Sequence, residues 1–273
     1  MKASSGYKKI IKHLLFNVIS GKKGYTDFKV LSGPAKGCKL RLDIRYEGSY
    51  WLGNYDKSII HAVPFSRIIP AGAVVWDCGT YVGYYTCIFR EIIGETGSVI
   101  AFEALSKTYD KVKFLPELNN WKNVKVLNLA IGPDHTVVKF VNNLGANNGP
   151  LNLGKIYKES RKCLETEHVK SCDVDELVYE IGIEAPDFIK FDLESGEEFA
   201  LHNGDRLYKE KRPFILLELH GERAKHAAGL FFEKYQYAGI LMQDMERQLK
   251  PIRSVNDFAK IEGVPHMIFC LPE

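Results

Sequence analysis

Titratable side chains gather at two points in the second half of the sequence, each at the end of an apolar run. Asp192 and Glu194 are two residues apart, so a regular strand projects both from one face, and Lys190 joins them there. Glu218 and His220 have the same spacing at the end of the next apolar run. If both runs are parallel strands, their ends open onto one crevice. These groups could there take the proton of a hydroxyl whose oxygen attacks an electrophilic methyl group, because a neutral alcohol is a weak nucleophile.

Two other interpretations of this cluster stay open. Asp192, Glu194 and His220 offer the oxygen and nitrogen donors that divalent metal ions bind in proteins. The same carboxylates could instead form a structural salt-bridge network with Lys190 and Arg223. We favour proton transfer, so Asp192, Glu194 and His220 are predicted to be catalytic, and no metal ion is predicted.

A glycine turn follows an earlier apolar run and reads Asp77-x-Gly79-x-x-x-Gly83. Gly79 allows backbone to approach a ligand closely, and Gly83 allows a helix to begin tightly against the strand. A dinucleotide fingerprint needs a further glycine where Tyr81 would obstruct the pyrophosphate, and the Gly-Lys-Ser/Thr of a P-loop does not follow. Asp77 would repel a phosphate but suits a ligand that carries an ammonium and a sulfonium group.

The apolar run after this turn ends at Glu103. An acidic residue at the tip of the second strand of such a sheet can accept hydrogen bonds from both ribose hydroxyls. Together, the glycine turn and Glu103 predict S-adenosyl-L-methionine rather than NAD as the cofactor.

Alternating strand and helix patterns must position these groups. From residue 70 onward, this alternation is typical of a parallel sheet with helices on both faces. The expected strands are Val74–Trp76, Val99–Phe102, Val124–Leu129, Phe188–Leu193, Phe214–Leu219 and Met267–Leu271, and the expected helices lie near Gly83–Ile93 and Lys107–Asn119. Residues 134–172 break the rhythm, with extra strands at Thr136–Val141 and His168–Cys172 around the loop Asn142–Pro150.

The N-terminal segment differs from the rest in charge. Its first 26 residues hold six lysines and no acidic residue, and apolar residues recur at helical spacing between Tyr7 and Val18. This amphipathic helix could pack on the body of the protein or make a peripheral contact with an anionic membrane surface. Residues 25–56 are predicted to form short strands and turns.

The overall composition excludes several classes of protein. The chain has 273 residues, 37 basic and 34 acidic, and a net charge of +3, whereas dedicated nucleic-acid binders carry a strong basic excess. No apolar stretch reaches the roughly 18 residues of a membrane span, and the N-terminal run is a poor signal peptide. The six cysteines include no Cys-x-x-Cys pair and fit a reducing compartment, so we expect a cytoplasmic protein.

Several motifs, in this order along the chain, resemble those of the FkbM family of S-adenosylmethionine-dependent methyltransferases. They are Tyr50–Asp56, Asp77–Thr86, Phe102–Leu105, Asn128–Gly132, Ile189–Glu197 and Phe214–His220. Three positions depart from the family pattern: Thr80-Tyr81 stands for the usual Ala-Asn, Ala104 for Pro, and Ser195-Gly196 shifts the usual glycine by one.

The resemblance implies a Rossmann-like class I methyltransferase fold, with a seven-stranded, mostly parallel sheet whose last strand is antiparallel. We expect this domain over residues 70–273, with the insertion at about 134–172 shaping the acceptor pocket. Residues 1–69 would form an N-terminal helix and a small β extension packed on the core.

The resemblance also assigns residues and a reaction. Asp77, Gly79 and Gly83 would line the methionine end of the cofactor and Glu103 its ribose, while Asp192 and Glu194 would face the reacting groups. Tyr81 and Asp192 also count among the predicted cofactor contacts. The implied reaction is O-methylation of a carbohydrate, glycolipid or natural-product hydroxyl, with S-adenosyl-L-homocysteine as product.

We expect Asp192 or His220 to act as base, with Glu194 as the orienting group. Amide side chains of the loop Asn142–Pro150 would suit sugar hydroxyls. An NAD-type oxidoreductase and a non-catalytic partner-binding protein on a methyltransferase scaffold remain alternatives.

Overall fold

The computed structural model describes residues 24–62, 65–132, 136–142, 165–241, 251–262 and 266–273. The expected N-terminal amphipathic helix and the loop Asn142–Pro150, apart from Asn142, lie outside these residues. No helix in the described ranges is long and apolar enough to cross a membrane.

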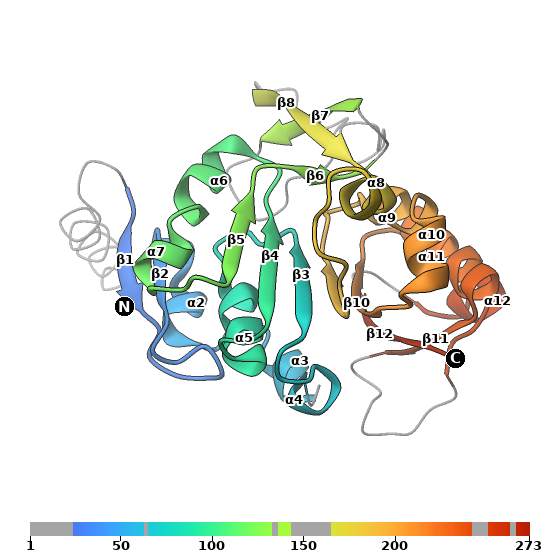
Figure 1. The fold of residues 1–273 in the computed structure, drawn as a ribbon, viewed down its shortest axis with the longest axis horizontal. Helices are drawn as coiled ribbons and strands as arrows, with labels where there is room; N and C mark the ends of the chain where they lie inside the picture. The colour runs from blue at the N-terminus through green and yellow to red at the C-terminus, as the bar shows by residue number, and fades with distance from the viewer. Residues whose placement is uncertain (1–23, 63–64, 133–135, 143–164, 242–250, 263–265) are drawn as a thin grey trace, which may run out of the picture.

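A seven-stranded sheet forms the centre of the molecule (Figure 1). Its spatial order is β11-β12-β10-β9-β3-β4-β5, and only β12 runs antiparallel to its neighbours. The strands are β3 (Val74–Cys78), β4 (Ser98–Phe102), β5 (Val124–Leu127), β9 (Phe188–Phe191), β10 (Phe214–Leu219), β11 (Tyr237–Leu241) and β12 (His266–Pro272). The predicted sheet with its antiparallel last strand is confirmed.

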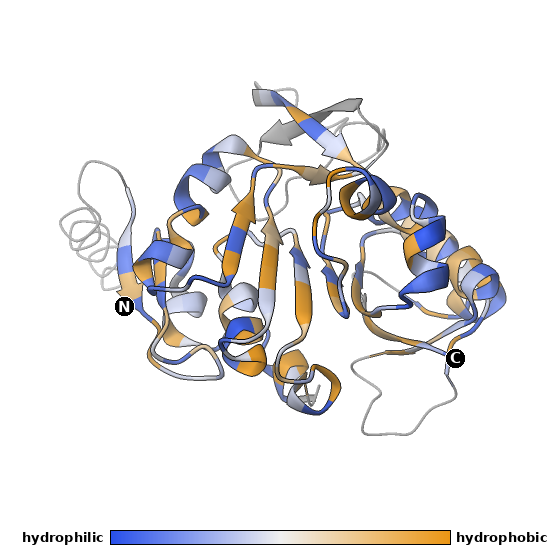
Figure 2. Ribbon diagram, viewed as in Figure 1, coloured by the Kyte–Doolittle hydropathy of each residue, from blue (hydrophilic) through white to orange (hydrophobic). Residues whose placement is uncertain are grey.

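Burial explains why these runs form strands. Every residue of β3 and β9 is buried, as expected for parallel strands covered on both faces. Figure 2 shows apolar residues along the central strands and hydrophilic residues on the outer helices. After β3 the chain adds β4 and β5 on one side, and it later returns to place β9 on the other side. The point between β3 and β9 is therefore the topological switch point, where ligands bind in open α/β sheets.

Helices pack on both faces of the sheet. One face carries α5 (Tyr84–Ile93) and α7 (Leu115–Leu118), and the other carries α8 (Val174–Tyr179), α9 (Glu197–His202), α10 (Asp205–Glu210), α11 (Glu222–Tyr235) and α12 (Val255–Phe258). Alternate strand residues serve the two sides: Val75 belongs to the first apolar cluster, and Trp76 belongs to the second.

The predicted helix over Lys107–Asn119 is wrong in one respect, because it is broken into α6 (Ser106–Val112) and α7. Pro116 lies in the first turn of α7, where the missing N–H is tolerated, and it cannot continue an earlier helix. Gly83 precedes α5 at φ +84°, and a Cβ there would lie 2.5 Å from the side chain of Leu115. The close packing at Gly83 is thus against α7 rather than against the strand.

The N-terminal extension packs on the α5 face. It holds the antiparallel pair β1 (Thr26–Lys29) and β2 (Lys39–Leu42), followed by α2 (Gly48–Leu52), α3 (Lys57–Ala62) and α4 (Phe65–Ile68). The prediction of strands and turns over residues 25–56 missed α2. A separate sheet of β6 (Ala130–Ile131), β8 (Glu165–Cys172) and β7 (Thr136–Asn142) forms the described part of the insertion.

Candidate active site

A cleft opens at the carboxyl ends of β3, β4 and β9 and encloses about 1060 Å³ of empty space, part of it continuous with solvent. Its walls come from the turn after β3, the tip of β4, the residues after β9, the strand β6 and the N-terminal extension. Five of the residues predicted to form the site line this cleft: Gly79, Tyr81, Glu103, Asp192 and Glu194.

Gly79 is required by the packing of two strand ends. It has φ +84°, and a Cβ at this position would lie 1.9 Å from the carbonyl oxygen of Asp192. Only glycine lets the turn after β3 pass so close to the end of β9. The sequence predicted a close backbone approach to a ligand, and the structure shows a close approach to Asp192.

Asp77 lies behind the cleft and does not line it. Its side chain is fully buried, accepts a hydrogen bond from Thr86 at 2.5 Å and lies 3.9 Å from the ammonium group of Lys190. Lys190 also donates to Asp192 at 2.9 Å. Burial alone would lower the pKa of Lys190, but Asp192 and Asp77 outweigh it and raise that pKa, so Lys190 stays charged. Asp77 thus fixes the cation that holds Asp192, and contributes only indirectly to the cleft.

Glu103 is the most enclosed carboxylate of the cleft. It is 7% exposed and accepts hydrogen bonds from the backbone N–H groups of Tyr81 and Leu105, each at 3.0 Å. Burial raises the pKa of Glu103 to about 7, although these two donors oppose the shift. A carboxylate that is buried beside a cavity gains further stabilisation from hydroxyl donors of a ligand, which is the arrangement expected for a ribose.

Tyr81 connects the glycine turn to the N-terminal extension. Its hydroxyl donates to Glu47 at 2.7 Å, and Lys111 forms an ion pair with the same carboxylate oxygen. The Lys111 ammonium group lies 5.0 Å from the centre of the Tyr81 ring. Tyr81 has φ +51°, a left-handed conformation that asparagine adopts more readily than tyrosine. The Glu47 contact therefore holds a strained residue in place.

Sequence reasoning missed the wall that the extension contributes. Tyr50 and Tyr55 line the cleft and stack on each other with ring centres 4.2 Å apart. Asp56, at φ +45°, accepts a hydrogen bond from Tyr85, another residue of the cleft wall, at 3.1 Å. Burial raises the pKa of Asp56 to about 6. The motif Tyr50–Asp56 could have indicated this wall. Its spacing, however, does not show that it lies beside cleft residues that are almost 30 to 140 positions later in the chain.

The expected strand face shared by Asp192 and Glu194 does not exist, because β9 ends at Phe191. Glu194 and Ser195 have φ +48° and +82°, so the chain turns sharply there. Ser195 occupies a backbone position that favours glycine, whereas Gly196 has φ −89°. The turn still directs Glu194 into the cleft wall, where burial raises its pKa to about 7.

Glu197, at the start of α9, organises this turn. Its side chain is fully buried, and Oε1 accepts hydrogen bonds from the N–H groups of Leu193 at 3.0 Å and Ser195 at 3.3 Å. The same oxygen lies 2.9 Å from Nδ1 of His220. One buried carboxylate thus fixes both the turn after β9 and the orientation of His220, leaving Nε2 of the ring for other partners.

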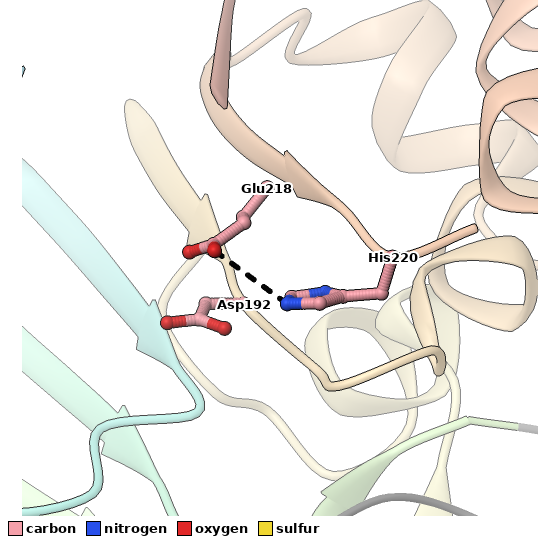
Figure 3. Close-up of side chains that lie close together, drawn as sticks. All are labelled: Asp192, Glu218 and His220. Carbon is pink, nitrogen blue, oxygen red and sulfur yellow. Dashed lines mark ion pairs between the residues drawn. The ribbon is translucent and has the colours of Figure 1, made fainter. Parts of the chain in front are cut away.

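Carboxylates surround the free nitrogen of His220. Nε2 lies 3.5 Å from Oε1 of Glu218 and 3.7 Å from Oε2 of Glu194. Burial alone would lower the pKa of His220, but its contacts with Glu197 and Glu218 raise it to about 11. Figure 3 shows Glu218 and His220, from β10 and its end, converging on Asp192. Arg223 lies elsewhere and pairs with Glu198 at 2.5 Å, so the salt-bridge network expected with it does not form.

These features define a class of protein: a Rossmann-like sheet with a ligand cleft at its switch point. Comparison with family models gives the particular family. The methyltransferase FkbM domain matches residues 77–247, which is more than half of the chain. The chain therefore belongs to the FkbM methyltransferase family, as the motifs predicted.

Comparison with solved structures gives distant similarities. Methyltransferase FkbM from Methylobacillus flagellatus KT has a TM-score of 0.42 and 12% identity over 78% of this chain, which spans 52% of that protein. An O-methyltransferase from Bacillus cereus, in complex with SAH, has a TM-score of 0.44 and 13% identity over 80% of this chain and 81% of the other. TYW2 from M. jannaschii, in complex with AdoMet, has a TM-score of 0.45 and 15% identity over 92% of this chain and 86% of the other. No curated protein matches the sequence.

S-adenosyl-L-methionine is the cofactor of this methyltransferase family member. The cleft fits it on its own chemistry. Glu103 presents a buried carboxylate for hydroxyl donors at the tip of β4, and the acidic residues Asp192 and Glu194 follow β9, on the other side of β3. A cofactor with ribose hydroxyls at one end and cationic groups at the other complements this distribution of acceptors and charge.

Proposed function

We propose that this methyltransferase methylates a hydroxyl oxygen, with a carbohydrate or glycolipid-like molecule as acceptor. The observation that carries the proposal is the placement of Glu194. It lies in the wall of the cofactor cleft, and its carboxylate is 3.7 Å from the imidazole of His220 at the end of β10. A hydroxyl that enters the cleft thus meets a carboxylate that can receive its proton.

Three residues would hold the cofactor. Glu103 accepts from the ribose hydroxyls, the turn at Gly79 forms the floor, and Asp192 attracts the cationic end. S-adenosyl-L-methionine supplies the electrophilic methyl group, and its sulfur keeps the electron pair of the broken carbon–sulfur bond, leaving S-adenosyl-L-homocysteine. The chain contributes by holding the acceptor oxygen in line with that methyl group, a positioning effect that accounts for much of the rate of such transfers.

Glu194 is the proposed general base. The sequence predicted Asp192 or His220 in this role and Glu194 as the orienting group, and we propose the reverse assignment. Asp192 accepts a hydrogen bond from Lys190 at 2.9 Å, and its remaining acceptor capacity is assigned to the cofactor rather than to the hydroxyl proton. His220 carries a proton at neutral pH because neighbouring carboxylates raise its pKa to about 11. Glu194, with a pKa of about 7, exchanges a proton near neutral pH, which suits a general base. The hydroxyl proton passes to Glu194 and from there to solvent.

The acceptor side of the cleft is aromatic. Tyr50, Tyr55, Tyr84 and Tyr85 line the same cleft as Glu194, and we assign them to the acceptor. Flat rings beside hydrogen-bonding groups suit a ligand with an apolar face and hydroxyl substituents, as a sugar ring has. The resemblance of the motifs to FkbM enzymes supports the same acceptor class. The described cysteines are buried thiols, which fits reaction in the reducing cytoplasm.

The test is methyl transfer from S-adenosyl-L-methionine labelled on its methyl group to a panel of glycans and glycolipids. We expect labelled methyl ether in at least one hydroxylated acceptor. Glu194→Gln should lower kcat by about 100-fold or more, while the folded variant should still bind S-adenosyl-L-homocysteine through Glu103, the turn at Gly79 and Asp192. A label found on nitrogen or carbon, or a Glu194→Gln variant with full kcat on its acceptor, would overturn the proposal.

A further inference from the structure

Two strand ends place three different donor groups around one point. A carboxylate oxygen of Asp192, a carboxylate oxygen of Glu218 and a ring nitrogen of His220 all lie within 4.8 Å of one another (Figure 3). Ligands on opposite sides of a metal ion at about 2.1 Å are about 4.2 Å apart, so small side-chain movements suffice to close this set. The side chains of Asp192, Glu218 and His220 are 22%, 19% and 16% exposed, so an ion in solution can reach them.

The orientation of His220 supports the same point. The fully buried Glu197 holds Nδ1 at 2.9 Å, and its other oxygen, Oε2, has no hydrogen-bond partner in the described part of the chain. Metal-binding histidines typically have such a carboxylate on the second ring nitrogen, because it fixes the ring and makes the ligating nitrogen more basic. Nε2 is left facing Glu218 and Asp192.

The charge around the point is unbalanced. Among the described residues, five carboxylates lie within 3.9 Å of two cationic side chains: Asp77, Asp192, Glu194, Glu197 and Glu218. Those two are Lys190 and, when it is protonated, His220. Buried and partly buried carboxylates in such excess favour the uptake of a further cation.

We propose that Asp192, Glu218 and His220 bind one divalent metal ion that accepts both oxygen and nitrogen ligands, such as Mn²⁺, beside the methyl-transfer site. Carboxylates and imidazole together suit Mn²⁺ better than Mg²⁺, which prefers oxygen alone. The ring binds the ion as a neutral imidazole, so its proton leaves to solvent.

The site deepens the proposed function, on which its role in catalysis depends. Three protein ligands leave coordination positions open for oxygen atoms of the acceptor. A bound hydroxyl loses its proton more readily, and Glu194, 3.7 Å from Nε2 of His220, is placed to receive it. The ion would thus select acceptors with two neighbouring hydroxyls, which can both bind to it.

The test is titration of the full-length protein with MnCl2, following the electron paramagnetic resonance signal of free Mn²⁺. We expect one ion per chain, with or without S-adenosyl-L-homocysteine. Glu218→Gln and His220→Gln should weaken binding by about 100-fold, and Glu197→Gln by 10-fold or more. His226→Gln removes an exposed histidine of α11 that lies beside Glu222, and it should leave binding unchanged.

Three results would overturn the metal site. The first is a dissociation constant for Mn²⁺ above about 1 mM. The second is equal Mn²⁺ binding by wild type and by folded Glu218→Gln and Asp192→Asn variants. The third is displacement of Mn²⁺ by S-adenosyl-L-homocysteine, one molecule for each ion. One-for-one displacement would show that Asp192, Glu218 and His220 bind the ammonium group of the cofactor instead of a metal ion. The titration needs no acceptor, so it is independent of the methyl-transfer assay. Methyl transfer by a protein that does not bind Mn²⁺ would support the proposed function and refute the metal site.

Discussion

Replacing Glu103 with glutamine should stabilise the cofactor-free protein at high pH while weakening cofactor binding. Burial raises the pKa of Glu103 from 4.5 to about 7, so its ionised form is disfavoured in the folded state. Between these two pH values the folded chain binds more protons than the unfolded chain, and stability falls as pH rises. At 1.36 kcal/mol per pH unit, the full penalty above pH 7 is roughly 3 kcal/mol.

Glutamine avoids this penalty but keeps only one acceptor oxygen for the N–H groups of Tyr81 and Leu105, at a cost of about 1 kcal/mol. We therefore expect Glu103→Gln to be slightly less stable than wild type at pH 5. At pH 8 the difference should shift by roughly 2 to 3 kcal/mol in favour of the variant.

Urea unfolding of both proteins at pH 5 and pH 8, without cofactor, measures this shift. Calorimetric titration with S-adenosyl-L-homocysteine at pH 8 should show 10- to 100-fold weaker binding by the variant, because charged acceptors contribute about 1.5 to 3 kcal/mol per hydrogen bond. A stability difference that is the same at both pH values would refute the buried, ionisable Glu103 on which the ribose site depends.

Three further substitutions test the framework. Lys190→Met should lower the free energy of unfolding by about 3 to 5 kcal/mol, because it leaves Asp77 and Asp192 without their cation; thermal unfolding checks this, and a loss under 1 kcal/mol would contradict it. Ser195→Gly should raise the free energy of unfolding by about 1 kcal/mol, because glycine adopts φ +82° without strain. Ser195→Ala, which keeps a Cβ at this position, should not raise it. Gly79→Ala should cost about 3 kcal/mol and abolish cofactor binding, since its Cβ meets the Asp192 carbonyl; a normally folded, cofactor-binding variant would show that the turn can shift.

Much of the fold was predictable because the sheet is buried on both faces. Strands such as β3 and β9 then appear as short apolar runs, and the polar residues just after them mark the edge where ligands bind. That reasoning located Gly79, Glu103 and Asp192 in the cleft wall without any knowledge of tertiary contacts.

The remaining parts of the site depend on contacts that local patterns do not encode. Tyr50 reaches the cleft through packing of the extension on α5, and Glu197 acts through a hydrogen bond to a residue 23 positions away. Asp77 has the residue type expected for a ligand contact, yet full burial makes it a partner of Lys190 instead. The turn at Glu194 departs from a strand because Glu197 captures its backbone N–H groups, which spacing alone could not reveal.

The most direct test of the central claim is a crystal structure of the protein with S-adenosyl-L-homocysteine. The account predicts difference density over the turn at Gly79, with both ribose hydroxyls hydrogen-bonded to Glu103 and the sulfur facing Asp192 and Glu194. Cofactor bound elsewhere, or with its ribose away from Glu103, would contradict it.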